Sequence, residues 1–156
     1  MSRVTTFHSP LGKISAGFIG DSLCLLEIGK ADTDRMSNSN AAMKKLSAEL
    51  AAYFRDKQFQ FTINLQPYGT DFQQGVWSAL REIPAGGTLS YGQLAEKLHS
   101  SPRAVGNACR ANPIPIIIPC HRVVGKNGIG GYDGKTSGRR LDIKRWLLHH
   151  EGINIA

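Results

Sequence analysis

The chain has few cysteines and no long apolar run. Cys24, Cys109 and Cys120 are its only three cysteines, and they form no C-x-x-C pair, which argues against a disulfide framework and a cysteine-based zinc site. Residues 1–30 lack the basic start and apolar core of a secretion signal, and no segment is apolar for long enough to span a bilayer. We therefore expect a cytoplasmic protein in a reducing compartment, with no membrane partner, no metal and no cofactor.

Acidic residues are scarce in one half of the chain. The formal charge is +7 at pH 7, and Lys97–Arg145 holds ten lysines and arginines against two acids, Asp133 and Asp142. Phosphate neutralisation by lysine and arginine dominates sequence-independent affinity for nucleic acids, and a one-sided basic patch is its usual footprint. A basic segment can also be a merely solvated surface. The charge distribution nevertheless favours this half as the nucleic-acid-binding half.

The N-terminal part has the pattern of a small sheet packed on one helix. Three strands are expected in order, over Val4–His8, Lys13–Ile19 and Ser22–Ile28. Apolar side chains at helical spacing predict a helix over 41–57 with Asn40 as its N-cap, and alternation over 59–65 predicts a further half-buried strand. Because residues 1–65 contain no nucleophile or metal constellation, we expect residues 1–66 to form a scaffolding α/β domain.

Short helices follow a linker at residues 66–70. They are expected over Phe72–Ile83 with Asp71 as the cap, over Tyr91–Leu98 with Ser90 as the cap, and from Pro102 to about Ala111. The last two suggest a helix-turn-helix, although an ordinary helical hairpin gives the same pattern. Asn127-Gly128 is a strong hairpin-turn signal and predicts a wing over 123–132.

These elements together predict an α+β fold. The small N-terminal α/β domain, with a three- to four-stranded sheet and one helix, is followed by a helical, winged-helix-like DNA-binding domain over residues 67–156.

The residues with the clearest chemistry lie between Asn112 and Gly125. Ile116–Ile118 is an uninterrupted β-branched run between prolines, which excludes the middle of a helix and predicts a short buried segment that holds Cys120 rigidly. A thiol reacts as its thiolate, so a reactive cysteine in apolar surroundings needs a base or a cation beside it. His121 and Arg122 both qualify. An isolated cysteine is more often a core side chain, but the Pro-Cys-His-Arg context favours a nucleophile.

A family resemblance rests on the same stretch. Pro119-Cys120-His121-Arg122-Val123-Val124-Gly125, preceded by Asn112-Pro113 and followed by Gly131-Tyr132, resembles the signature of the O6-alkylguanine-DNA alkyltransferases. The resemblance extends over Phe72–Gly152. It implies a suicidal DNA repair protein that flips the damaged base and transfers the alkyl group of O6-alkylguanine, and more weakly of O4-methylthymine, to Cys120. It also implies binding to the minor groove of double-stranded DNA, and we expect a monomer.

The resemblance assigns roles to single residues. Cys120 would be the nucleophile and methyl acceptor, His121 its base, and Glu151 the carboxylate that orients His121. Tyr91 would give a proton to the base, and Asn112 would support the active-site turn. DNA contacts are expected from Arg103, which would replace the extruded guanine, and from Gln73, Tyr91, Gly92, Ser101, Ala104, Gly106, Arg110 and Lys126. The substrate pocket is expected at Cys109, Pro115, Val123, Tyr132 and Asp133.

The sequence departs from the family pattern near this pocket. Asp133 stands where many members have a small residue, and the loop 134–140 is longer than in the shortest members. A carboxylate at the pocket rim would affect the binding of bulky alkyl groups. Cys109 is expected to act mainly in packing.

Two other functions stay open. A non-catalytic damage-recognition protein of the alkyltransferase-like kind would lack the cysteine that Cys120 supplies. A cysteine hydrolase could use Cys120, His121 and Glu151, because such a trio does not decide between turnover and self-inactivation. An alkyl group retained on the protein would distinguish all three.

Overall fold

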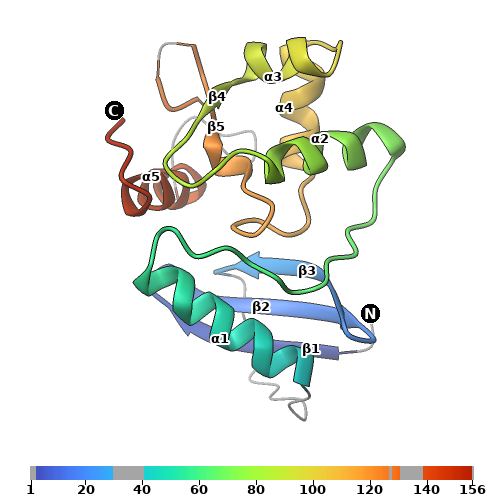
Figure 1. Cartoon of the computed structure of the whole chain (residues 1–156), viewed down its shortest axis with the longest axis vertical. Coiled ribbons are helices and arrows are strands. Elements are labelled where there is room, and N and C mark those ends of the chain that lie inside the picture. The colour runs from blue at the N-terminus through green and yellow to red at the C-terminus, as the bar shows by residue number, and fades with distance from the viewer. Residues whose placement is uncertain (1–2, 30–40, 127, 131–138, 156) are drawn as a thin grey trace. The chain divides into compact units, whose positions relative to one another are not determined.

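The chain divides into two compact units, Met1–Tyr68 and Gly69–Ala156. The computed structural model describes residues 3–29, 41–126, 128–130 and 139–155, and Figure 1 shows their helices and strands in chain order. The break between the units falls just after Tyr68, close to the expected boundary between residues 66 and 67.

The first unit is built on an antiparallel sheet. Its strands are β1 (Arg3–Ser9), β2 (Gly12–Ile19) and β3 (Ser22–Ile28), paired in the order β1-β2-β3. The tight connection between β1 and β2 is held by Ser9, whose hydroxyl donates to the Gly12 carbonyl at 2.7 Å and accepts from the Leu11 amide at 3.1 Å. The three expected strands and the hairpin are therefore confirmed.

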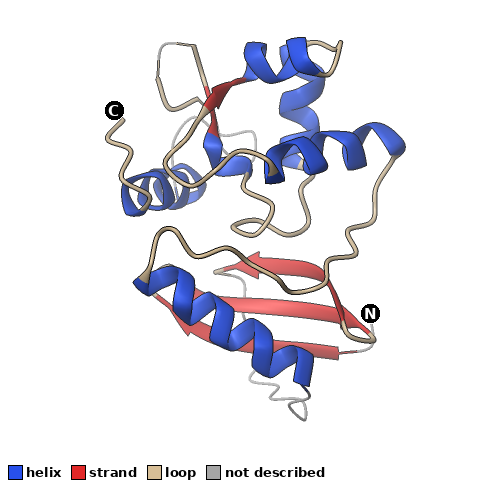
Figure 2. Ribbon diagram, in the orientation of Figure 1, coloured by secondary structure: helices blue, strands red, loops and turns tan. Residues whose placement is uncertain are grey.

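Helix α1 (Ala41–Arg55) packs along the sheet (Figure 2). Its apolar stripe consists of four fully buried side chains, Met43, Leu46, Leu50 and Tyr53, which confirms the helix expected from their spacing. The helix ends at Arg55, two residues before the expected Lys57. The expected N-cap, Asn40, lies outside the described residues.

The strand expected over 59–65 is wrong. Only Leu65 bridges to Leu23, in parallel orientation. The buried carboxylate of Glu49 on α1 takes the donors that a strand would offer to a neighbour: the amides of Thr62 and Ile63 donate to it at 3.0 and 3.1 Å, and the Thr62 hydroxyl at 2.5 Å. Because each backbone donor needs a partner, these bonds hold the segment along α1 instead of in the sheet, which has three strands among the described residues.

The second unit contains four α-helices among the described residues. They are α2 (Asp71–Arg81), α3 (Tyr91–Lys97), α4 (Pro102–Arg110) and α5 (Arg139–His150). Ser90 caps α3 as expected, and α4 begins with Pro102 after its N-cap Ser101. The cap of α2 is Thr70 and not Asp71, because the Thr70 hydroxyl accepts the Gln73 amide and the Gln73 side chain returns a bond to the Thr70 amide.

Short strands and a tight turn complete this unit. β4 (Leu89–Ser90) and β5 (Val123–Val124) pair in parallel, and Gly125 bridges antiparallel to Gly128 where the hairpin turn was expected. Asn127 of that turn and residues 131–138 of the expected wing and loop lie outside the described residues. The observed mixture of a small sheet and a helical second unit confirms the α+β class.

Helix α5 was not expected from the sequence. Its buried side chains, Leu141, Ile143, Lys144, Leu147 and Leu148, share one face of the helix, but this face includes a lysine and the opposite face carries Trp146, so the apolar periodicity is weak. The helix ends on Gly152, whose φ of 89° is readily adopted only by glycine. Gly152 donates to the His149 carbonyl and Ile153 to the Leu148 carbonyl, which is the Schellman pattern. The pattern leaves Glu151 at the helix end. No helix within the described ranges is long and apolar enough to cross a membrane.

The role of Glu49 leads to a stability prediction. Glu49→Ala removes the acceptor of two buried amides and one hydroxyl, so we expect the free energy of unfolding to fall by about 2–4 kcal/mol. Urea denaturation measures this value. Lys45→Ala, at an exposed position of the same helix, is the control and should change stability by less than about 0.5 kcal/mol. Equal effects of the two substitutions would show that Glu49 does not anchor residues 62–63.

Candidate active site

The turn before Cys120 is held by one asparagine. Asn112 accepts the Ile114 amide at 2.9 Å and donates its own side-chain amide to the Ile118 carbonyl at 2.8 Å. Ile116 within this turn has φ +76°, which a β-branched residue adopts only under constraint from its surroundings. The isoleucines are buried as expected, and Cys120 itself is 6% exposed. The turn therefore presents the thiol rigidly.

The parallel pairing of β4 with β5 brings Tyr91 to this turn. Ser90 pairs with Val124, so Tyr91, the next residue after β4, starts α3 close to the chain that leaves the short 3₁₀ helix η1 (Cys120–Arg122). The Tyr91 ring packs against a backbone with no side chain in the way. A Cβ on Gly130 would lie 3.1 Å from the ring and 2.7 Å from the Gly125 amide, so glycine is required there.

His121 is paired with Glu151 inside the protein. The Nε2 atom of His121 lies 2.9 Å from Oε2 of Glu151. His121 is 0% exposed and Glu151 is 2% exposed. The sequence separates them by 30 positions, and the end of α5 brings them together. A carboxylate bonded to Nε2 fixes the orientation of the imidazole ring, which is the role expected for Glu151.

Arg122 completes the neutralisation of Glu151. Its Nε donates to Oε1 at 2.8 Å and its Nη2 to Oε2 at 2.9 Å, in the two-pronged geometry that makes arginine–carboxylate pairs strong. Its Nη1 donates to the Ile83 carbonyl at the end of α2, at 2.5 Å. The guanidinium is thus committed to Glu151 and Ile83, and the alternative in which Arg122 serves as the cation beside the thiol is not supported by its contacts.

The electrostatics leave His121 able to accept a proton. Burial lowers the pKa of His121 below its ordinary value, Glu151 opposes that shift, and Arg122 and Lys144 add to it. The imidazole is therefore neutral at pH 7. With Nε2 facing the carboxylate, the proton is on Nε2 and the lone pair is on Nδ1, which has no hydrogen-bond partner among the described atoms. This nitrogen is the available base next to Cys120.

Sequence reasoning missed Lys144. It is fully buried, donates to the Val123 carbonyl at 2.8 Å, lies 3.4 Å from the Tyr91 hydroxyl, and sits 5.5 Å from the centre of that ring. Burial lowers its pKa to about 8, while Cys120 and Cys109 oppose the shift. A lysine on a helix is usually solvated, and the only sequence signal was its place between apolar neighbours, Ile143 and Leu147.

Tyr91 and Cys109 both keep their protons. Burial, followed by the two thiols Cys109 and Cys120, raises the pKa of Tyr91 well above its ordinary value. Burial and Cys120 raise the pKa of Cys109 to about 12, and Lys144 opposes this shift. Tyr91 is thus a proton donor, and Cys109 is an unreactive neighbour of the nucleophile, in line with the packing role expected for it.

The expected DNA-contacting residues other than Tyr91 fall into three groups. Four are exposed: Gly92, Arg103, Arg110 and Lys126. Two polar ones act as helix caps, since Ser101 accepts the Ala104 amide and Gln73 accepts the Thr70 amide. Ala104 and Gly106 of α4 are partly exposed. Helix α4 is therefore thin, with Arg103 and Arg110 at its two ends.

The expected substrate pocket is described only in part. Cys109 and Val123 are buried, and Pro115 is half-buried. Tyr132, Asp133 and the loop 134–138 lie outside the described residues. None of the side chains placed by the structure forms a group of three or more histidine, cysteine or acidic residues that could hold a metal ion.

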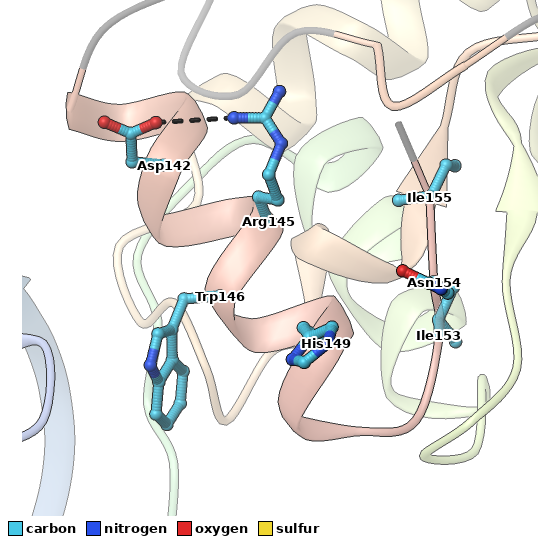
Figure 3. A pocket seen from close by; sticks show the side chains of 7 residues that line it. All are labelled: Asp142, Arg145, Trp146, His149, Ile153, Asn154 and Ile155. Atoms are coloured by element: carbon cyan, nitrogen blue, oxygen red, sulfur yellow. Dashed lines mark hydrogen bonds and ion pairs between the residues drawn. The ribbon is translucent and has the colours of Figure 1, made fainter.

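A separate open pocket of about 410 Å³ lies on another face of α5 (Figure 3). It is lined by Asp142, Arg145, Trp146, His149, Ile153, Asn154 and Ile155. The helical spacing of the first four places them away from Lys144, Leu148 and Glu151, which face the catalytic cluster. At its rim Arg145 and Asp142 form an exposed ion pair at 3.4 Å. The pocket contains none of the expected site residues.

Known proteins resemble the chain over nearly its whole length. The family model "6-O-methylguanine DNA methyltransferase, DNA binding domain" matches residues 71–153. A methylated-DNA–protein-cysteine methyltransferase of Methanosarcina acetivorans is 40% identical over 154 residues, covering 94% of this chain and 96% of the relative. The Bacillus subtilis protein of that name, described as constitutive, is 35% identical and covers 99% and 98%.

A solved structure agrees with these relatives. The crystal structure of Mycobacterium tuberculosis OGT in complex with DNA has a TM-score of 0.81 to this chain at 37% identity, covering 95% of this chain and 91% of the other.

The buried position of Lys144 leads to a paired prediction. Lys144→Met removes a cation from the interior, so we expect the free energy of unfolding at pH 7 to rise by about 1–2 kcal/mol. The same change removes the positive charge that favours the Cys120 thiolate, so alkylation of Cys120 by iodoacetamide at pH 7 should slow by roughly tenfold. Denaturation and the alkylation rate measure the two effects.

The control is Lys97→Met at an exposed position, which should leave both values unchanged. The pH dependence gives a second readout. Because the folded state releases the Lys144 proton near pH 8 and the unfolded state near 10.5, the native protein should gain stability between these values, and the Met variant should lack this gain. Lower stability with an unchanged alkylation rate would contradict the assignment.

Proposed function

We infer the function of the chain from one premise: it belongs to the 6-O-methylguanine DNA methyltransferase family. Its relatives carry the name methylated-DNA–protein-cysteine methyltransferase, and a related OGT was solved in complex with DNA. The chain is a DNA repair protein that transfers the alkyl group of O6-alkylguanine in DNA to its own Cys120. The observation that carries this assignment is Cys120 next to a neutral, carboxylate-bound His121 inside the matched region.

The transfer begins with deprotonation of the thiol. His121 takes the Cys120 proton at Nδ1, directly or through a water, and the imidazolium that forms is stabilised by Glu151. The sulfur then attacks the alkyl carbon, and the bond between this carbon and O6 breaks. The bonding electrons pass to the guanine ring system, so the leaving base needs a proton.

Tyr91 supplies that proton to a ring nitrogen. Its raised pKa keeps the hydroxyl protonated until the base becomes more basic during bond cleavage. The nearby Lys144 ammonium, 3.4 Å from the hydroxyl oxygen, then stabilises the phenolate. The product on the protein is a thioether, which offers no easy leaving group to water. Each chain therefore reacts once, and this distinguishes it from a cysteine hydrolase.

Helix α4 is proposed as the DNA-binding element, in the minor groove of double-stranded DNA. Ala104 and Gly106 allow close approach, the exposed Arg103 takes the place of the flipped guanine, and Arg110 and Lys126 contact phosphates. Gly92 and the capped ends at Ser101 and Gln73 line this surface. Tyr132, Asp133, Pro115, Val123 and Cys109 would bound the alkyl group, and O4-methylthymine would be a weaker substrate.

The two units take different roles in this proposal. Residues 1–66 serve as a scaffold, and residues 67–156 bind DNA and react. The three free cysteines fit the reducing conditions of the cytoplasm, where the protein would act as a monomer.

The central prediction is a reaction that stops after one turnover. Incubation with DNA containing O6-methylguanine should add one methyl group per chain, at Cys120 alone, as measured by peptide mass mapping. Cys120→Ser should bind the damaged duplex and transfer nothing, because binding relies on α4 and the basic surface. Methyl groups on Cys24 or Cys109, or many turnovers with Cys120 unmodified, would refute the mechanism.

The extrusion role of Arg103 is tested by comparing two substrates. Arg103→Ala should slow repair of O6-methylguanine in a duplex by tenfold or more, because base flipping costs a few kcal/mol, while repair of the free base should change little. Single-turnover rates on both substrates give the ratio. Arg81→Ala, at an exposed position on α2, is the control. If duplex and free base lose rate equally, Arg103 does not serve in extrusion.

A further inference from the structure

We propose that Arg122 is a positioning residue for the alkyl transfer, which holds Glu151 as an ionised, correctly oriented partner of His121 and thereby keeps His121 able to act as the base. This inference rests on the proposed function. In this role Arg122 acts on Glu151 and not directly on the Cys120 thiol.

Glu151 depends on the groups around it to stay charged. It is 2% exposed, so water contributes little to its solvation, and an isolated buried carboxylate would take up a proton. It also sits at the C-terminal end of α5, where the helix dipole disfavours negative charge. His121 is neutral and offers one hydrogen bond. Arg122 supplies two more, at 2.8 and 2.9 Å, together with a full positive charge.

The geometry of Arg122 also fixes where the carboxylate points. Its third bond, to the Ile83 carbonyl, anchors the guanidinium to the end of α2. The fork then holds both Glu151 oxygens, and Oε2 is shared between Arg122 and His121 Nε2. Rotation of the carboxylate would break two bonds at once. The imidazole is consequently held with its Nδ1 on the side away from Glu151.

The charges around His121 determine in which direction the pH dependence of the reaction should shift when Arg122 is replaced. The charged groups that act on it are Glu151 at the end of α5, Lys144 on α5 and Arg122 on η1. Arg122 and Lys144 lower the pKa of His121, and Glu151 raises it. If Arg122 loses its charge, the pKa of His121 rises, because a nearby positive charge no longer opposes protonation. His121 then stays protonated up to a higher pH, and in that form it cannot accept the thiol proton.

The test measures the single-turnover methyl transfer rate of the full-length protein on methylated duplex DNA from pH 5 to 9. Arg122→Met removes the charge and the fork, so the acidic limb of the profile should move to higher pH by about one unit or more, and the plateau rate should fall. Arg122→Lys keeps the charge without the fork, so the limb should stay in place while the plateau rate falls.

The endpoint of the reaction separates catalysis from folding. The number of methyl groups per chain at long times counts the correctly folded molecules, and the rate is measured on those molecules alone. A purely structural role of Arg122 would lower the endpoint and leave the pH position of the limb unchanged, which would overturn the proposal. If Arg122→Met does not fold, Arg122→Lys decides, because an unchanged plateau rate in that variant would also overturn it.

Two controls complete the experiment. Arg55→Met replaces an exposed arginine at the end of α1, outside the basic half of the chain, and should leave the profile unchanged. In a Glu151→Ala background, which removes the acceptor, Arg122→Met should no longer lower the plateau rate, because no carboxylate is left for Arg122 to position. If the native protein transfers no methyl group at all, the proposed function fails. If it transfers one and the limb position is the same in all Arg122 variants, only this inference fails.

Discussion

The second unit depends on neutralising one carboxylate in its interior. Glu151 lies among side chains that exclude water, and His121 and Arg122 donate three hydrogen bonds to it that offset the burial of its charge. To satisfy this requirement, the end of α5, the turn of η1 and the end of α2 have to meet. The thiol is fixed at the same point, since Cys120 directly precedes His121 and lies two residues before Arg122 in the sequence. The contacts of Glu151 therefore both stabilise this junction and position Cys120.

A second buried charge, that of Lys144, also interacts with the thiol. Lys144 is held by the Val123 carbonyl and the Tyr91 hydroxyl, and burial costs it part of its affinity for a proton. A methionine would pack there at lower cost. In the proposed mechanism the positive charge is useful there, because it favours the thiolate of Cys120 and the phenolate of Tyr91. The site thus gives up stability to hold its charges in place.

Local signals in the sequence predicted local structure well. The cap Ser90, the helix-starting Pro102 and the spacing of Met43, Leu46 and Leu50 are signals within a few residues, so the helices they mark were found. The strand over 59–65 failed because a side chain from α1, Glu49, competes for its amides, and no local pattern reveals such a competitor. Helix α5 and Lys144 were missed for the same reason, since burial of a lysine is decided by Tyr91 and Val123 far away in the chain. The pairing of Glu151 with His121 was anticipated through the family motif and not from spacing.

The position of Glu151 has a consequence for the newly made chain. The residues that assemble the site run from Ile83 to Glu151, and Glu151 leaves the ribosome last of these. Until then the imidazole has no carboxylate, the guanidinium has no fork partner, and the long loop between them has not been closed. A nascent chain therefore carries an ordinary thiol. Because each molecule can react only once, this order of assembly protects an unfinished protein from being spent on stray electrophiles.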